Sequence, residues 1–247
     1  MRFAALLLLC SCAAAPHVGL PPLTWRSPWR VGDTFRIVRK IEYHISSEAL
    51  GMKEERGLSI DGEERYCFHA RVVGEEAKGV GVDVTVDPPV DKAFDHPYHL
   101  TMDGRAMMVD WVGRLDATQT LGAVGGGERY GVTTGLLREF PDGPIECGRT
   151  WNFINSVVLA HCNFAEFEMA CTLETTKDGY VVSADVLLKP EPGVELDWNL
   201  RHLGTGTWHL SADLRRIRGA LSFEIRNLEA KSILRWSEEV EVAPETR

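Results

Sequence analysis

The chain has 247 residues, of which 27 are Lys or Arg and 36 are Asp or Glu, so its formal net charge is −9. No cluster of basic residues forms a stripe that could follow a phosphate backbone, which argues against nucleic acid as a partner. Hydrophobic residues make up 44% of the chain and charged residues 26%, the balance of a folded globular protein and not of a disordered one.

The N-terminus carries the signature of export. Arg2 is followed by the apolar run from Phe3 to Leu9 and then by small residues. A positive start, a short apolar core and small residues predict a secretory signal peptide over residues 1–11. No later window reaches the roughly 18 apolar residues that a membrane-spanning helix needs. We therefore expect the membrane to hold this chain only through its N-terminus.

The end of this signal resembles a bacterial lipobox. Leu9 lies three residues before Cys12, and the small residue Ser11 directly precedes it. The resemblance implies that Cys12 becomes the lipidated first residue of the mature protein. Ala13 gives no inner-membrane retention signal of the aspartate type, so the resemblance implies a bacterial cell envelope protein, in the outer membrane and facing the periplasm or the surface.

Residues 12–30 read as a proline-rich tether between the lipid and the folded body. Pro16, Pro21, Pro22 and Pro28 interrupt a stretch with little periodicity. Such a composition predicts a segment that is mobile or draped over the body. Its tryptophans, Trp25 and Trp29, are expected to cover the mouth of the fold or to rest at the lipid headgroups.

Period-two alternation of apolar and polar residues dominates the rest of the chain and predicts strands with one buried and one solvent-exposed face. We therefore predict a mainly β fold of antiparallel sheets, a half-barrel or sandwich. One to three short helices are expected, within residues 48–56, 105–120 and 132–140. The apolar positions that alternate are Phe35, Ile37, Ile41, Tyr43 and Ile45; Tyr66, Phe68, Ala70 and Val72; Val80, Val82, Val84 and Val86; Tyr180, Val182, Ala184, Val186 and Leu188; and Leu221, Phe223 and Ile225.

An internal duplication is also visible. Residues 98–105 align without gaps against residues 208–215, with identical His, Leu, Asp and Arg. Upstream, residues 32–35 match residues 148–151, and turn signals at 78–79 match those at 178–179. These matches predict two pseudo-repeated β units, residues 31–140 and 141–247.

The order of these features resembles uncharacterised bacterial envelope lipoproteins with two tandem β units. The resemblance rests on a Gly-Asp-aromatic strand start at 32–35, a Phe-Pro-x-x-Pro-x-x-x-Gly-x-x-Trp junction at 140–151 and a Gly-x-Gly-x-Trp strand at 204–208. The shape is also similar, more weakly, to the half-barrels of lipoprotein carriers, which hold acyl chains on a concave apolar face. Both resemblances imply an architecture and no catalytic residues.

Local signatures of catalysis are absent from the sequence. There is no Gly-x-Ser-x-Gly, no Cys-x-x-Cys and no phosphate-binding glycine motif. Asp95, His96 and His99 lie close enough to suggest a metal-dependent hydrolase, but their spacing matches no known ligand motif. His99 and His209, each near an aspartate, are more economically cross-strand polar pairs. We expect no metal and no cofactor.

Four cysteines follow Cys12, and an oxidising envelope would allow them to pair. Cys162 and Cys171 flank a polar-aromatic segment that reads as a turn. The sequence therefore predicts a disulfide across a hairpin, with buried, reduced thiols as the alternative.

The leading hypothesis is a lipid-anchored envelope protein, not an enzyme, that binds an apolar or amphipathic ligand on a concave face. The alternatives are a structural or assembly lipoprotein that holds a protein partner by its acidic face or exposed sheet edges, and a metal-dependent hydrolase. The expected ligand contacts are inward aromatic residues: Phe35, Tyr43, Tyr98, Trp151 and Trp208.

Overall fold

The computed structural model describes residues 20–47, 58–86, 98–112, 130–135, 137, 139–159, 162–189, 201–227 and 232–245. These residues are mainly antiparallel β structure with almost no helix, which confirms the prediction of a mainly β fold with antiparallel sheets. The helix expected over 105–120 is wrong where the chain is described, because residues 107–112 form a strand. Residues 132–134 form a turn instead of a helix, and residues 48–56 lie outside the described part. Within that part, no helix has the length and apolar character needed to cross a membrane.

One sheet of twelve strands contains two successive meanders. The first comprises β2 (Thr34–Ser47), β3 (Leu58–Glu76), β4 (Gly79–Val86), β5 (Tyr98–Met102), β6 (Met107–Val112) and β7 (Tyr130–Gly131). The second comprises β9 (Thr150–Leu159), β10 (Cys162–Thr175), β11 (Gly179–Leu188), β12 (His202–Ser211), β13 (Ile217–Asn227) and β14 (Ser232–Pro244). Within each meander, consecutive strands pair, and β2 pairs with β14 to join the two. A separate small sheet pairs β1 (Leu23–Thr24) with β8 (Pro144–Ile145).

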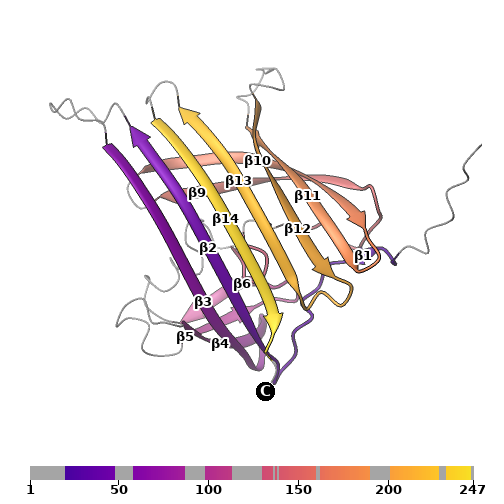
Figure 1. Cartoon of the computed structure of the whole chain (residues 1–247). Helices are drawn as coiled ribbons and strands as arrows, with labels where there is room; N and C mark the ends of the chain where they lie inside the picture. Colours follow the sequence, from indigo (N-terminus) through magenta and orange to yellow (C-terminus); the bar gives the residue numbers. More distant parts are fainter. Residues whose placement is uncertain are drawn as a thin grey trace, which may run out of the picture.

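The sheet is open and strongly curved. Figure 1 shows β3, β2, β14 and β13 in front, while β9 and β10 cross behind them and β4 to β6 lie behind their lower ends. Phe167 of β10 accordingly packs against Phe223 of β13, three strands away in the sheet order, with ring centroids 4.8 Å apart. The core is therefore enclosed between the middle of the sheet and its own ends.

The predicted alternation places side chains as expected. Phe35, Ile37 and Ile41 of β2 are at most 2% exposed, and Phe68 and Val72 of β3 are equally buried. Each such side chain contributes about 1.5–3 kcal/mol when it is fully removed from water. Burial along one face of every long strand is thus what holds the curved sheet together.

A buried ion pair interrupts this apolar face where the two meanders meet. Arg39 of β2 and Glu238 of β14 lie on the inner face, and the Arg39 Nε donates to the Glu238 Oε1 at 2.9 Å. Both side chains are 3% exposed. Charges this deeply buried are tolerated only when they are paired, so the pair links β2 to β14 specifically.

The entry to each meander has the same hydrogen bonds. The Gly32 amide donates to Val72 O at 2.8 Å, and the Gly148 amide donates to Leu173 O at 2.7 Å. Both glycines adopt positive φ, +93° and +81°, which glycine accepts without steric cost. The same turn therefore precedes β2 and β9, as the match between residues 32–35 and 148–151 predicts.

The later part of the predicted alignment is out of register. Val80, which follows the first hairpin glycine, pairs with Met102, whereas Tyr180 pairs with Leu210. Met102 therefore corresponds to Leu210, although the ungapped alignment set it against Ala212. The shift is two residues, which keeps every side chain on the same face because strands have period two.

Residues 20–30, expected in the tether, pack onto the folded body. Leu23, Trp25 and Trp29 are at most 5% exposed. Trp25 stacks on Phe140 and Trp29 stacks on Phe35, each with ring centroids 4.2 Å apart. These two tryptophans are core residues and do not lie at lipid headgroups.

Candidate functional site

A groove of about 900 Å³ crosses five neighbouring strands, β3, β2, β14, β13 and β12. It lies toward the end of the sheet that is uppermost in Figure 1. Its lining belongs to three adjacent cross-strand rows. The first row is Asp61, His44, Arg235 and Glu224; the second is Gly62, Tyr43, Trp236, Phe223 and Gly204; the third is Glu63, Glu42, Ser237, Ser222 and Thr205.

The middle row forms the floor of this groove. Its side chains point toward the core, where Trp236 is 1% and Phe223 is 4% exposed. Tyr43 stacks beside Trp236 at a centroid separation of 6.2 Å. A Cβ on Gly62 would lie 2.1 Å from Tyr43 Cζ, so the absence of a side chain at Gly62 makes room for this ring. The groove therefore has an aromatic layer directly beneath its floor.

The two outer rows form polar walls. In the first, the His44 Nδ1 lies 2.6 Å from the Asp61 Oδ1, and the Arg235 Nε donates to the Glu224 Oε2 at 2.6 Å. Hydrogen bonds from Arg235 and Arg226 lower the pKa of Glu224. In the third row, the carboxylates of Glu42 and Glu63 are exposed. Both walls therefore present fixed charge to a molecule in the groove.

Negative charge predominates in the lining. The carboxylates of Glu42, Asp61, Glu63 and Glu224 face the guanidinium of Arg235 and two histidines, His44 and His202. Lys40 forms ion pairs with Glu42 and Glu63 from one side. A cationic group is thus the favoured guest on electrostatic grounds.

The structure does not bring the five predicted ligand contacts together. Tyr43 is among the residues that line the groove. Phe35 and Trp208 are 0% and 2% exposed and belong to the packed core, so their assignment as ligand contacts is corrected. Trp151 is half-buried, and its Nε1 donates to Glu139 O at 2.8 Å. Tyr98 lies in β5, and its side chain is outside the described part.

His99 forms a cross-strand polar pair, as predicted. It lies opposite Asp83, and the two side chains are 2.7 Å apart at Nδ1 and Oδ1, while the Glu76 carboxylate lies 2.5 Å from Nε2. Hydrogen bonds to Asp83 and Glu76 raise the pKa of His99. His209 differs, because it lies opposite Val181 and Arg218. No metal-binding group of His, Cys, Asp or Glu occurs among the described residues, while Asp95 and His96 lie outside them.

The predicted disulfide is wrong, because Cys162 and Cys171 do not flank a turn. Both lie in β10, nine residues apart along one extended strand, which separates them by about 30 Å. A disulfide needs Cα atoms within about 7 Å. Cys171 is a free, buried thiol, and burial raises its pKa to about 12. Cys12 lies outside the described residues.

Sequence reasoning missed the groove because its lining comes from five strands whose register cannot be read from one chain. A local signal did exist. Polar residues alternate at 42 and 44, 61 and 63, 222 and 224, and 235 and 237, which marks one wet face on four strands. Only the pairing of those strands places the four segments side by side.

Comparisons with known proteins add little. No protein family and no curated protein matches this chain. Among solved structures, the crystal structure of the ywiB protein from Bacillus subtilis is 8% identical, with 90% of this chain and 96% of that chain covered and a TM-score of 0.16. A likeness this slight carries no argument about fold or function.

Proposed function

We propose that this chain is an exported, lipid-anchored protein of the bacterial envelope that binds an amphipathic ligand without catalysing a reaction. The observation that carries the proposal is the groove over β3, β2, β14, β13 and β12, with acidic walls and an aromatic layer under its floor. The signal-like N-terminus and the lipobox resemblance at Cys12 support the location.

The groove favours an amphipathic ligand over a purely apolar one. The inner faces of the strands are occupied by packed side chains such as Ile41, Phe68 and Leu221, each at most 2% exposed. A ligand with a cationic group would replace the Lys40 ammonium, which already pairs with Glu42 and Glu63, and would lay its apolar part along the groove between the two polar rows. The chemistry of the lining thus supports a cationic amphiphile.

The finer architecture belongs to this proposal. We infer that the two six-strand meanders are pseudo-repeated units of one half-barrel, joined where β2 pairs with β14. The matching turns at Gly32 and Gly148 support this origin. The half-barrel would then carry its ligand groove on strands of both units.

Binding of decyltrimethylammonium, measured by titration calorimetry below its micelle concentration, tests the proposal. The uncharged decyl maltoside, with the same alkyl chain, is the matched probe. We expect the cationic probe to bind more tightly. Glu42→Gln with Glu63→Gln should weaken binding of the cationic probe by about twofold to thirtyfold, because each exposed ion pair contributes about 0.2–1 kcal/mol.

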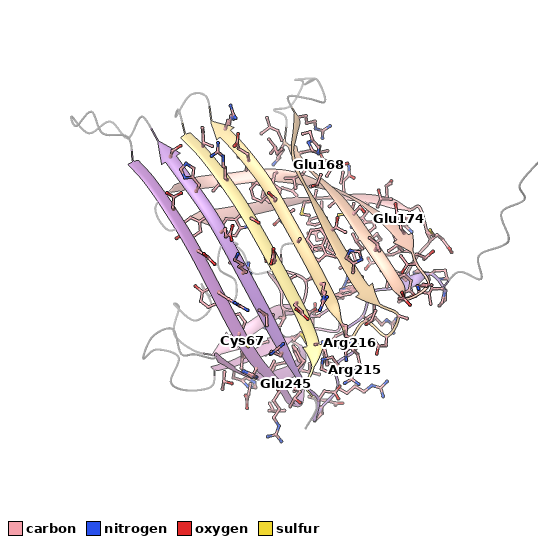
Figure 2. The ribbon with its side chains drawn as sticks, viewed as in Figure 1. Cys67, Glu168, Glu174, Arg215, Arg216 and Glu245 are labelled. Carbon is pink, nitrogen blue, oxygen red and sulfur yellow. The ribbon has the colours of Figure 1, made fainter. Side chains whose placement is uncertain are left out.

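Glu174→Gln is the control variant, because Glu174 is exposed on β10 and lies away from the groove (Figure 2). It should bind the cationic probe like the unaltered chain. Equal affinity for both probes would contradict a charge-selective groove. So would a Glu174→Gln variant that binds the cationic probe as weakly as the Glu42→Gln, Glu63→Gln variant.

The anchor is tested separately by the mass of the N-terminal peptide from envelope-purified protein. We expect a lipid on Cys12 as the first residue, and release of Cys12→Ser from the membrane fraction. An unlipidated N-terminus that keeps residues 1–11 would contradict the anchor. It would have no bearing on ligand binding in the groove.

A second function is supported by one observation at the sheet edge. β9 ends the strand order among the described residues, and its ten residues include no charge and no proline. Ile154 on this strand is 43% exposed. Edges of this kind pair readily with another strand. Crosslinking from Asn152 in cells would reveal a stoichiometric protein partner if the chain serves in assembly.

A further inference from the structure

Three side chains with the chemistry of an activated thiol lie together on the polar face of the sheet, away from the groove. Cys67 and His69 are two residues apart on β3 and so share a face. The Cys67 Sγ lies 3.8 Å from the His69 Nε2, and the His69 Nδ1 contacts the Glu245 carboxylate. Figure 2 shows Cys67 on β3 and Glu245 beyond the end of β14, both toward the lower end of the sheet.

This arrangement has the order nucleophile, base and orienting carboxylate. The Nδ1–H of His69 donates a hydrogen bond to the Glu245 carboxylate, which leaves Nε2 as the acceptor that faces the thiol. A thiol-to-imidazole separation of 3.8 Å is long but within the range seen before a reactant is bound. The side chains of His69 and Glu245 are 38% and 31% exposed, so reagents can reach them.

Three arginines lie near Cys67, although the protein as a whole is acidic and Asp83 lies opposite one of them, Arg71. Arg65 and Arg71 share its face of β3, and Arg36 lies opposite His69 on β2. All three arginines are exposed. An anionic reagent is therefore drawn to this thiol more than a cationic one.

We propose that Cys67 is a thiol–disulfide exchange site for low-molecular-mass anionic disulfides, activated by His69 and Glu245. The thiol passes its proton to His69 Nε2, and the Cys67 sulfur forms a bond to one sulfur of the disulfide. The original S–S bond breaks, and the leaving thiolate takes the proton from His69. The product is a mixed disulfide on Cys67 and one released thiol.

The chain supplies its own reference thiols. Cys147 is exposed and free, and Cys171 is free but buried. Trypsin places Cys67 in residues 66–71 and Cys147 in residues 139–149, whereas Cys171 shares residues 150–177 with Cys162, so fragmentation of that peptide is needed to read Cys171 separately. Cys147 reports the reactivity of an ordinary surface thiol, and Cys171 reports unfolding.

The experiment exposes the reduced full chain to oxidised glutathione, which is anionic, or to cystamine, which is cationic, and quenches with acid at intervals. With oxidised glutathione, we expect Cys67 to react at least about tenfold faster than Cys147, since a positioned base contributes a hundredfold or more. His69→Gln and Glu245→Gln should each remove most of this advantage. Arg65→Gln with Arg71→Gln should slow the reaction of Cys67 with oxidised glutathione and speed its reaction with cystamine, because the positive field is removed.

Equal rates at Cys67 and Cys147 would overturn the proposal, as would an advantage that survives both His69→Gln and Glu245→Gln. If His69→Gln disturbs the fold, the buried Cys171 becomes reactive and reveals the disturbance. The rate of Cys67 in the Glu245→Gln variant then tests the proposal. If the ratio of the rate with oxidised glutathione to the rate with cystamine is the same at Cys67 and at Cys147, the arginines do not select anionic disulfides.

Discussion

Arg39 and Glu238 give the sharpest test at the scale of single residues. The pair is buried between β2 and β14, with 2.9 Å between Nε and Oε1. Removing one partner leaves the other charge buried, so Arg39→Met or Glu238→Leu alone should cost about 3–5 kcal/mol of unfolding free energy. The double variant should recover most of that loss, because packed apolar groups replace the pair. Urea denaturation of the three variants would measure this, and additive losses would contradict it.

His99 predicts a pH dependence. Its pKa is raised in the folded protein by Asp83 and Glu76, so its stabilisation is fully present below the unfolded-state pKa of about 6.5 and is lost as pH rises through the folded-state pKa. His99→Gln should therefore lower stability by about 0.2–1 kcal/mol at pH 6 and by less at pH 8.5. His209→Gln is the matched control on β12, and a pH-independent loss at His99 would count against the ion cluster.

At the scale of elements, Trp208 of β12 is packed between two glycines. A Cβ on Gly219 of β13 would lie 2.2 Å from Trp208 Cδ1, and one on Gly206 would lie 2.6 Å from Cη2. Gly219→Ala should therefore cost about 1–3 kcal/mol through overpacking. Gly74→Ala, with open space around it, should change stability by less than about 0.5 kcal/mol. Thermal unfolding compares the two, and equal losses would show that Trp208 is not held in this way.

The strands themselves were largely predictable, because alternation at positions such as Phe35 to Ile45 follows from burying one face. The helices expected near residues 105 and 132 failed, because a short apolar run such as Met107–Val112 suits a strand as well as a helix. The predicted Cys162–Cys171 bridge is wrong for a related reason, because a polar segment inside one long strand has the composition of a turn. Trp25 and Trp29 lie among prolines, a composition typical of a tether, yet their rings are packed in the core.

Contacts between distant segments could not be read from the chain. Glu245 joins His69 across 176 positions, and Glu238 joins Arg39 across 199. Such pairs depend on the β2–β14 pairing, which no local pattern specifies. The groove depends on the same pairing, so the candidate sites emerged only with the fold.

At the scale of the whole molecule, the β2–β14 pairing makes one continuous sheet from two meanders. We therefore expect a single cooperative unfolding transition, with coincident midpoints by tryptophan fluorescence and far-ultraviolet circular dichroism. Two separated transitions would show that each meander is stable by itself and would weaken the case for a groove shared between them.

Native mass spectrometry of the full chain purified from a bacterial envelope tests the central claim most directly. We predict a stoichiometric cationic amphiphile on the unaltered chain and on Glu174→Gln, and its loss from the variant with Glu42→Lys and Glu63→Lys. A bare unaltered chain, or an amphiphile that stays bound when both groove carboxylates are reversed in charge, would contradict binding in this groove.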